Sequence, residues 1–157
     1  MDRAAIRLAN HIKRTVTGPM WHGAALESVL EGVTSDQAAA RPVANAHSIW
    51  EIVLHVVAWA DIARARLHGD RLADPQPHED WPPVTSTTEA DWALVVRRLS
   101  ESHRELAQDV RHLDETAIDA LVPGLEYTAS NLLHGVIEHG TYHGGQIALL
   151  KKAFKSR

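Results

Sequence analysis

Residues 132–150 read LLHGVIEHGTYHGGQIALL, and this stretch decides the fold class. Its apolar residues recur three or four positions apart, which is typical of a helix with one buried face. That face carries Leu132, Val136, His139, His143, Ile147 and Leu150. His139 and His143 therefore occupy core positions one turn apart, at the spacing that lets two imidazoles reach one metal ion. We expect this helix to span residues 128–154.

A second predicted helix, between Ser48 and Gly69, places His55 on an apolar stripe. Its neighbours on that stripe are Ile52, Trp59 and Ile62. Burying an imidazole that has no hydrogen-bond partner costs roughly a few kcal/mol, so His55 needs a partner. A metal ion shared with the two histidines of the last helix would meet this need. The alternative is a core histidine that bonds to the protein itself.

The rest of the chain is also predicted to be helical, with no strand pattern. The other expected helices cover residues 2–16, 20–31, 34–41, 88–113 and 115–120. Between the second and third long helices lies a proline-rich segment that contains Pro75, Pro77, Trp81, Pro82 and Pro83. We favour a long crossover connection over a flexible lid for this segment. Four long helices with such stripes predict an all-α fold, a four-helix bundle that forms one domain over residues 1–157.

Composition excludes several classes of function. The chain has 157 residues and no cysteine, which excludes disulfides, a cysteine nucleophile and metal sites built on thiolates. Its 16 Lys and Arg against 20 Asp and Glu give a net charge of −4, which disfavours nucleic-acid binding. Neither a signal peptide nor a membrane-spanning stretch is visible. We therefore expect a soluble cytoplasmic protein with no nucleic-acid or membrane partner.

Other polar residues are weaker candidates for a functional role. His103 lies on the core stripe of its helix, and we favour a core or boundary residue over a fourth metal ligand or a supporting group. His22 follows a Gly-Pro break and is a weak candidate for the mouth of a pocket. Glu51 is best explained as the capping-box partner of Ser48, and Glu138 is expected on the surface. From the sequence alone the catalytic residues stay unknown.

Three stretches together resemble the DinB/YfiT-like superfamily of metal-dependent enzymes. They are PMWHGAALESVLEGVTSDQAAARP (19–42), HSIWEIVLHVVAWADIARARLHGD (47–70) and IEHGTYHGGQIALLKKA (137–153). The resemblance implies a four-helix bundle with an extended crossover, and often a homodimer. It also implies a divalent metal bound by one histidine of the second helix and an H-x-x-x-H pair of the last. Carried onto this chain, the metal ligands are His55, His139 and His143.

The resemblance leaves the reaction open. Related branches include transferases of low-molecular-weight thiols and thiol-dependent maleylpyruvate isomerases, and others are described as metal-dependent hydrolases. We favour a transferase that takes a small-molecule thiol and an electrophile, with zinc or nickel as the metal. A metal-dependent hydrolase and a non-catalytic metal- or ligand-binding stress protein are the alternatives. A zincin protease is excluded because Gly140 follows His139, and Arg64 or Arg66 is a candidate for holding a carboxylate of the cosubstrate.

Overall fold

The computed structural model describes residues 2–71 and 73–155, and this part of the chain is helical without a β-strand. Four long helices are α1 (Arg3–Thr17), α4 (Ile49–Leu67), α6 (Glu89–Val110) and α8 (Ala129–Lys155). Four short ones are α2 (Leu26–Leu30), α3 (Ser35–Ala39), α5 (Pro77–Asp80) and α7 (Glu115–Asp119). The expected all-helical class is confirmed. No described helix is long and apolar enough to cross a membrane.

Side-chain caps fix where the long helices begin. Asp2 accepts hydrogen bonds from the first backbone amides of α1, and Thr88 accepts one at the start of α6. At α4, the Ser48 hydroxyl and the Glu51 carboxylate bond reciprocally to each other's backbone amide, so the predicted capping box is confirmed. Gly69, just beyond α4, has a φ of 75°, a conformation that favours glycine.

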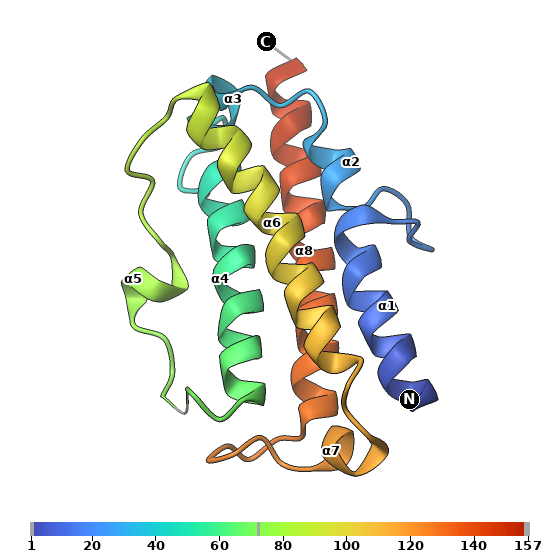
Figure 1. Cartoon of the computed structure of the whole chain (residues 1–157). Coiled ribbons are helices and arrows are strands. Elements are labelled where there is room, and N and C mark those ends of the chain that lie inside the picture. The colour runs from blue at the N-terminus through green and yellow to red at the C-terminus, as the bar shows by residue number, and fades with distance from the viewer. Residues whose placement is uncertain (1, 72, 156–157) are drawn as a thin grey trace.

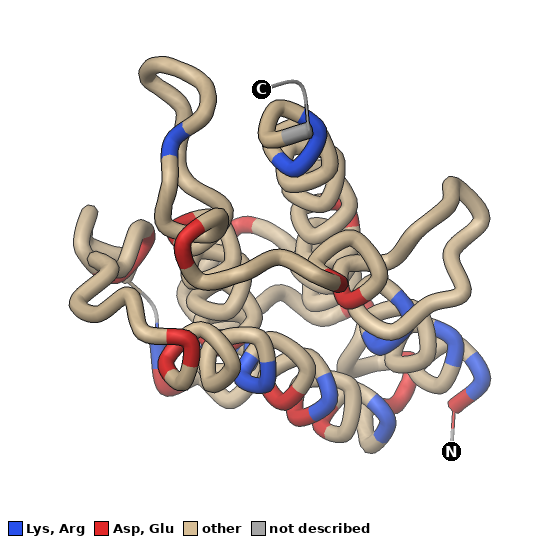
Figure 2. Tube along the Cα trace, turned by 90° about the horizontal axis from the view of Figure 1, so that it is seen from above, with Lys and Arg blue, Asp and Glu red and all other residues tan. Residues whose placement is uncertain are grey.

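The long helices pack so that each contacts two others. α1 lies against α6 and α8, and α4 lies against the same two helices from the other side (Figure 1). α8 runs opposite to α4 in direction, so the start of α8 lies beside the end of α4. Seen from above, Lys, Arg, Asp and Glu follow the outward side of α6 (Figure 2). The inward sides of the four helices build the core.

A polar layer divides the apolar core into two clusters. One cluster lies near the N-terminus of α1 and includes Ile12, Leu106 and Leu133. The other lies toward the opposite end and includes Trp50 and Ile147. Between these clusters lie five of the buried polar side chains: Thr15, His55, Ser102, His103 and His143. Because buried polar groups need partners, this layer is where a functional site is to be sought.

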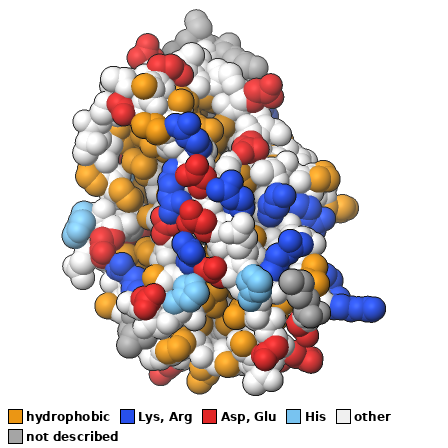
Figure 3. Space-filling model, in the orientation of Figure 1, with side chains coloured by type: hydrophobic (Ala, Val, Ile, Leu, Met, Phe, Trp, Pro, Cys, Tyr) orange, Lys and Arg blue, Asp and Glu red, His pale blue; other side chains and the backbone are white. Residues whose placement is uncertain are grey.

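The outer face of α4 and α6 carries interleaved ion pairs (Figure 3). Arg64 bonds to Glu105 and Asp109, and Arg98 bonds to Asp61 and Glu105. Exposed pairs of this kind contribute about 0–1 kcal/mol each, so they orient the two helices more than they stabilise them. Arg64 therefore makes its ion pairs on this outer face.

The segment before α2 differs from the sequence prediction. A helix was expected over residues 20–31, but the helical part begins only at Leu26. Gly23 has a φ of 132°, which a helix does not accommodate, and Trp21 is fully exposed. Residues 21–24 are exposed and bury no apolar side chain, so they gain nothing from helical packing.

Candidate metal centre

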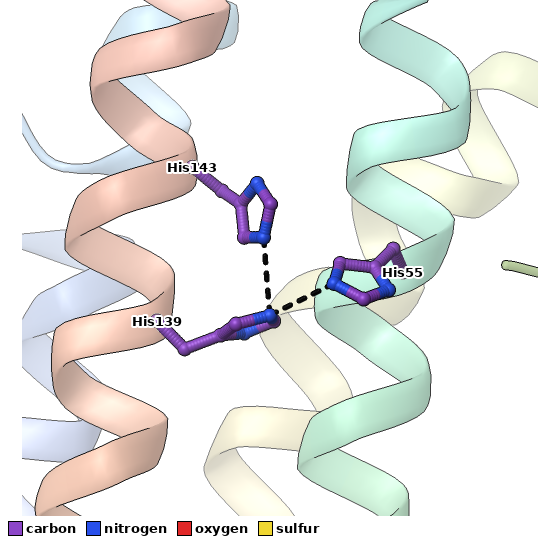
Figure 4. Close-up of side chains that lie close together, drawn as sticks. All are labelled: His55, His139 and His143. Carbon is purple, nitrogen blue, oxygen red and sulfur yellow. Dashed lines mark hydrogen bonds between the residues drawn. The ribbon is translucent and has the colours of Figure 1, made fainter. Parts of the chain in front are cut away.

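Two helices bring three histidines to one point. His55 comes from the middle of α4, and His139 and His143 come from successive turns of α8 (Figure 4). The Nε2 atom of His139 lies 2.9 Å from Nε2 of His55 and 3.1 Å from Nε2 of His143. The three ligand atoms all lie within 4.8 Å of one another. This spacing allows one ion to contact all three nitrogens.

The hydrogen bonds of the Nδ1 atoms of His55 and His143 show which nitrogen of each ring carries the proton. His55 Nδ1 lies 2.6 Å from the backbone carbonyl of Asp80, and His143 Nδ1 lies 2.7 Å from Oε1 of Gln146. A carbonyl oxygen only accepts, so both Nδ1 atoms carry the proton and donate it. The Nε2 lone pairs of both rings therefore face His139, an arrangement that orients imidazoles in metal sites.

The protons and lone pairs on the three Nε2 atoms show whether a cation fits between the rings. Three Nε2 atoms converge, and two of them bear lone pairs, so at most one N–H, that of His139, is available to bond them. Converging lone pairs repel each other unless a positive charge lies between them. Three neutral imidazoles suit a divalent first-row metal ion and leave positions open for further ligands. The donor set therefore fits the expected divalent cation.

Burial keeps these imidazoles neutral near pH 7. Burial, together with the neighbouring His143 and His55, lowers the pKa of His139 to about 3. Burial also lowers the pKa values of His55 and His143, although the Asp80 carbonyl and the Gln146 amide partly oppose the effect. Neutral imidazoles are the form that binds metal, because the proton and the metal compete for the same lone pair.

The segment between α4 and α6 forms one wall of the site. Trp81 follows α5, and its indole stacks on His55 with ring centroids 3.9 Å apart. The other stacking partner of Trp81 is His47, at 3.6 Å. Asp80 Oδ1 accepts a hydrogen bond of 2.7 Å from Trp59 Nε1. These contacts hold residues 80 and 81 against α4.

The histidines open onto a large cavity of about 1170 Å³ between α4, α8 and this wall. Its lining is mainly apolar, and the α4 face contributes Trp59 and Arg66 as well as His55. Asp80 is the one acidic residue among the described lining residues, and its carboxylate is already bonded to Trp59. A cavity of this size and character is typical of a binding site for a small organic molecule.

Several candidates from the sequence lie away from the histidine cluster. His103 is buried in the core, and its Nδ1 donates to the Leu99 carbonyl, so it stands apart from the three histidines. His22 is exposed and lines a different, smaller pocket. Glu138 is exposed, as expected.

Sequence reasoning missed the wall of the site. His47 was assigned no role, and the carbonyl of Asp80 and the ring of Trp81 had no local signal. These residues reach His55 across a loop, and no periodic spacing connects them to it. The cluster of prolines around Trp81 favoured a crossover connection, but it did not show which helix face the segment covers.

The helical fold and the histidine cluster together define a protein class that can hold a divalent metal between two long helices. Residues 21–147 match the model of the DinB superfamily, and the chain belongs to that superfamily. Comparison with curated proteins and with solved structures gives no significant match. The expected family is thus confirmed over most of the chain.

Proposed function

We propose that this protein is a metal-dependent enzyme in which His55, His139 and His143 hold one divalent cation. The convergence of three neutral Nε2 atoms carries the proposal. Borderline imidazole ligands suit zinc or nickel. The proposed architecture is a single four-helix-bundle domain over residues 1–157, in which the proline-rich segment crosses over the metal site.

We propose a transferase that acts with a low-molecular-weight thiol. A divalent metal, when bound, lowers the pKa of a coordinated thiol or water and so supplies a nucleophile at neutral pH. The chain has no cysteine, so the sulfur would come from a cosubstrate. Asp80, whose carboxylate bonds to Trp59, is poorly placed to act as a free base. A thiol, with a pKa of about 8.5, needs less help from a base than water does.

A metal-dependent hydrolase and a non-catalytic metal-binding stress protein remain the alternatives to the transferase. The setting that we propose is a cytoplasmic homodimer. The exposed Tyr142 and Leu149 on α8 are apolar side chains that a second copy would cover. Both side chains also line the cavity onto which the histidines open, so a second copy on this face would border the site.

The transferase proposal is tested by incubating zinc- or nickel-loaded protein with 1-chloro-2,4-dinitrobenzene and a panel of small thiols. Thioether formation that needs both thiol and metal, and that is lost in His139→Ala, supports it. The control is His134→Ala, because His134 is exposed on the same helix. Ester hydrolysis without a thiol would favour the hydrolase. Metal binding without turnover, either with the thiols or on esters, would favour the non-catalytic protein.

A further inference from the structure

The cavity holds a second functional group, a buried guanidinium, three turns along α4 from His55. Arg66 follows His55 by 11 residues, which places both on the same face about 16 Å apart along the helix axis. Its side chain is 4% exposed, yet it lines the same cavity as the histidines. Arg66 Cζ lies 5.7 Å from the Trp59 ring centroid, which lies 6.0 Å from that of His139. One indole ring therefore separates the guanidinium from the histidine cluster.

The protein compensates this buried charge incompletely. Arg66 Nη1 donates to Tyr127 Oη at 2.8 Å, and Nη2 donates to Asp74 Oδ1 at 2.9 Å. The Nε atom is buried without a hydrogen-bond partner among the described residues. The Asp74 side chain is 92% exposed, so water screens its charge strongly. A buried cation whose only carboxylate partner is in water lacks the buried counter-charge that such a group needs.

We infer that Arg66, with Tyr127 beside it, binds the carboxylate of an organic substrate whose reacting end reaches the three histidines. This rests on the proposed function, because it assigns the substrate class of the same site. Asn131, near the start of α8, also lines the cavity and offers an amide to the same anion. Arg66 is the only Lys or Arg in the described lining, which suits one carboxylate better than a phosphate dianion.

The part of the cavity between Arg66 and the histidine cluster suits an apolar group of the ligand. Trp59 of α4 and Val136 of α8 line it. Gly135 lies one turn from His139 on α8 and also lines the cavity. A Cβ at Gly135 would meet nothing within 4 Å, so the backbone there borders open space. The predicted ligand is therefore a monocarboxylate with an aliphatic or aromatic chain longer than one indole ring.

The experiment compares octanoate with 1-octanol, which shares the chain and lacks the charge. Binding to the metal-free, full-length protein is followed by calorimetry and tryptophan fluorescence. Wild-type protein is expected to bind octanoate at least tenfold more tightly than octanol. Arg66→Met should abolish this preference and leave octanol binding unchanged. Gly135→Leu should weaken both ligands, because its side chain fills the space between Arg66 and the histidine cluster.

Two more variants keep the test decisive if Arg66→Met fails to fold. Asp74→Asn removes the competing carboxylate from an exposed position and should strengthen octanoate binding severalfold. His139→Ala in the metal-free protein should keep the octanoate preference, which separates this inference from the metal proposal. Equal affinity for octanoate and octanol in the wild type would overturn the inference. A preference for octanoate that survives Arg66→Met would also overturn it. The same holds for a preference that depends on His139 or on added zinc.

Discussion

The indole of Trp81 stacks on the imidazole of His55, with ring centroids 3.9 Å apart and planes 5° from parallel. The residue before it, Asp80, accepts a hydrogen bond from Nδ1 of the same imidazole. A loop residue therefore packs against the histidine while its neighbour sets which nitrogen carries the proton. The ring orientation of His55 depends on a segment 25 residues further along the chain.

Trp81→Ala should weaken zinc binding about 10- to 100-fold, the usual effect of losing support behind a metal ligand. Without the indole, the segment that carries the Asp80 carbonyl is no longer held against His55. Zinc affinity is measured by competition with a chromogenic chelator. Trp21→Ala, at a fully exposed position, is the matched control. Equal affinity in these two variants would contradict the role given to Trp81.

Gln146→Leu should weaken zinc binding about tenfold without changing the stoichiometry. Oε1 of Gln146 accepts from His143 Nδ1, and Nε2 of Gln146 donates to Tyr142 Oη at 3.0 Å, so the amide is held in place. Isothermal titration with zinc gives both quantities. Leu149→Ala, one turn away and exposed, should bind like the wild type. The assignment fails if Gln146→Leu also binds with wild-type affinity.

Gly140→Ala should destabilise the fold by about 1–3 kcal/mol, because overpacking a close helix contact forces the neighbours apart. A Cβ at Gly140 would lie 2.6 Å from Cγ2 of Thr15 on α1. The Thr15 hydroxyl bonds to the His11 carbonyl at 3.1 Å, which restricts its rotation.

Gly145→Ala is the matched substitution on the same helix. A Cβ there meets nothing within 4 Å, so better helix propensity should stabilise the fold by up to about 1 kcal/mol. Chemical denaturation of both variants measures the difference. A Gly140→Ala variant that is as stable as the wild type would show that α1 and α8 do not require glycine at position 140.

His103 should make the fold sensitive to acid. Burial lowers its folded-state pKa from 6.5 to about 4. Between these values the unfolded chain binds more protons, so the free energy of unfolding should fall as the pH drops, by up to about 3 kcal/mol in total. His103→Leu should remove this part of the slope, whereas the exposed His134→Leu should keep it. Denaturant titrations of metal-free protein between pH 7 and pH 4 test this, and parallel slopes for wild type and His103→Leu would refute it.

The parts of the site that could be predicted are those encoded by helical spacing. The stripe on residues 132–150 and the i, i+4 pair placed His139 and His143 inward, and the apolar neighbours of His55 did the same for α4. The structure brings these three histidines together, as expected. The Ser48–Glu51 capping box was equally readable, because both partners lie within one turn.

The parts that could not be predicted depend on tertiary placement. Arg64 and Arg66 were equivalent in sequence, yet two residues rotate a helix by about 200°. Arg64 therefore faces the ion pairs of α6, and Arg66 faces the cavity. His47 looked unremarkable until the proline-rich segment brought Trp81 between it and His55. Long-range contacts of this kind leave no periodic signal.

Metal analysis of untagged protein tests the central claim most directly. After incubation with zinc or nickel and removal of the excess, the wild type should retain about one equivalent of metal. The His139→Ala/His143→Ala double variant should retain none, and His55→Ala should retain far less than the wild type. His134→Ala, on the exposed side of α8, should bind like the wild type. A folded wild-type protein that retains no metal, or a double variant that retains a full equivalent, would contradict a metal site built from these three histidines.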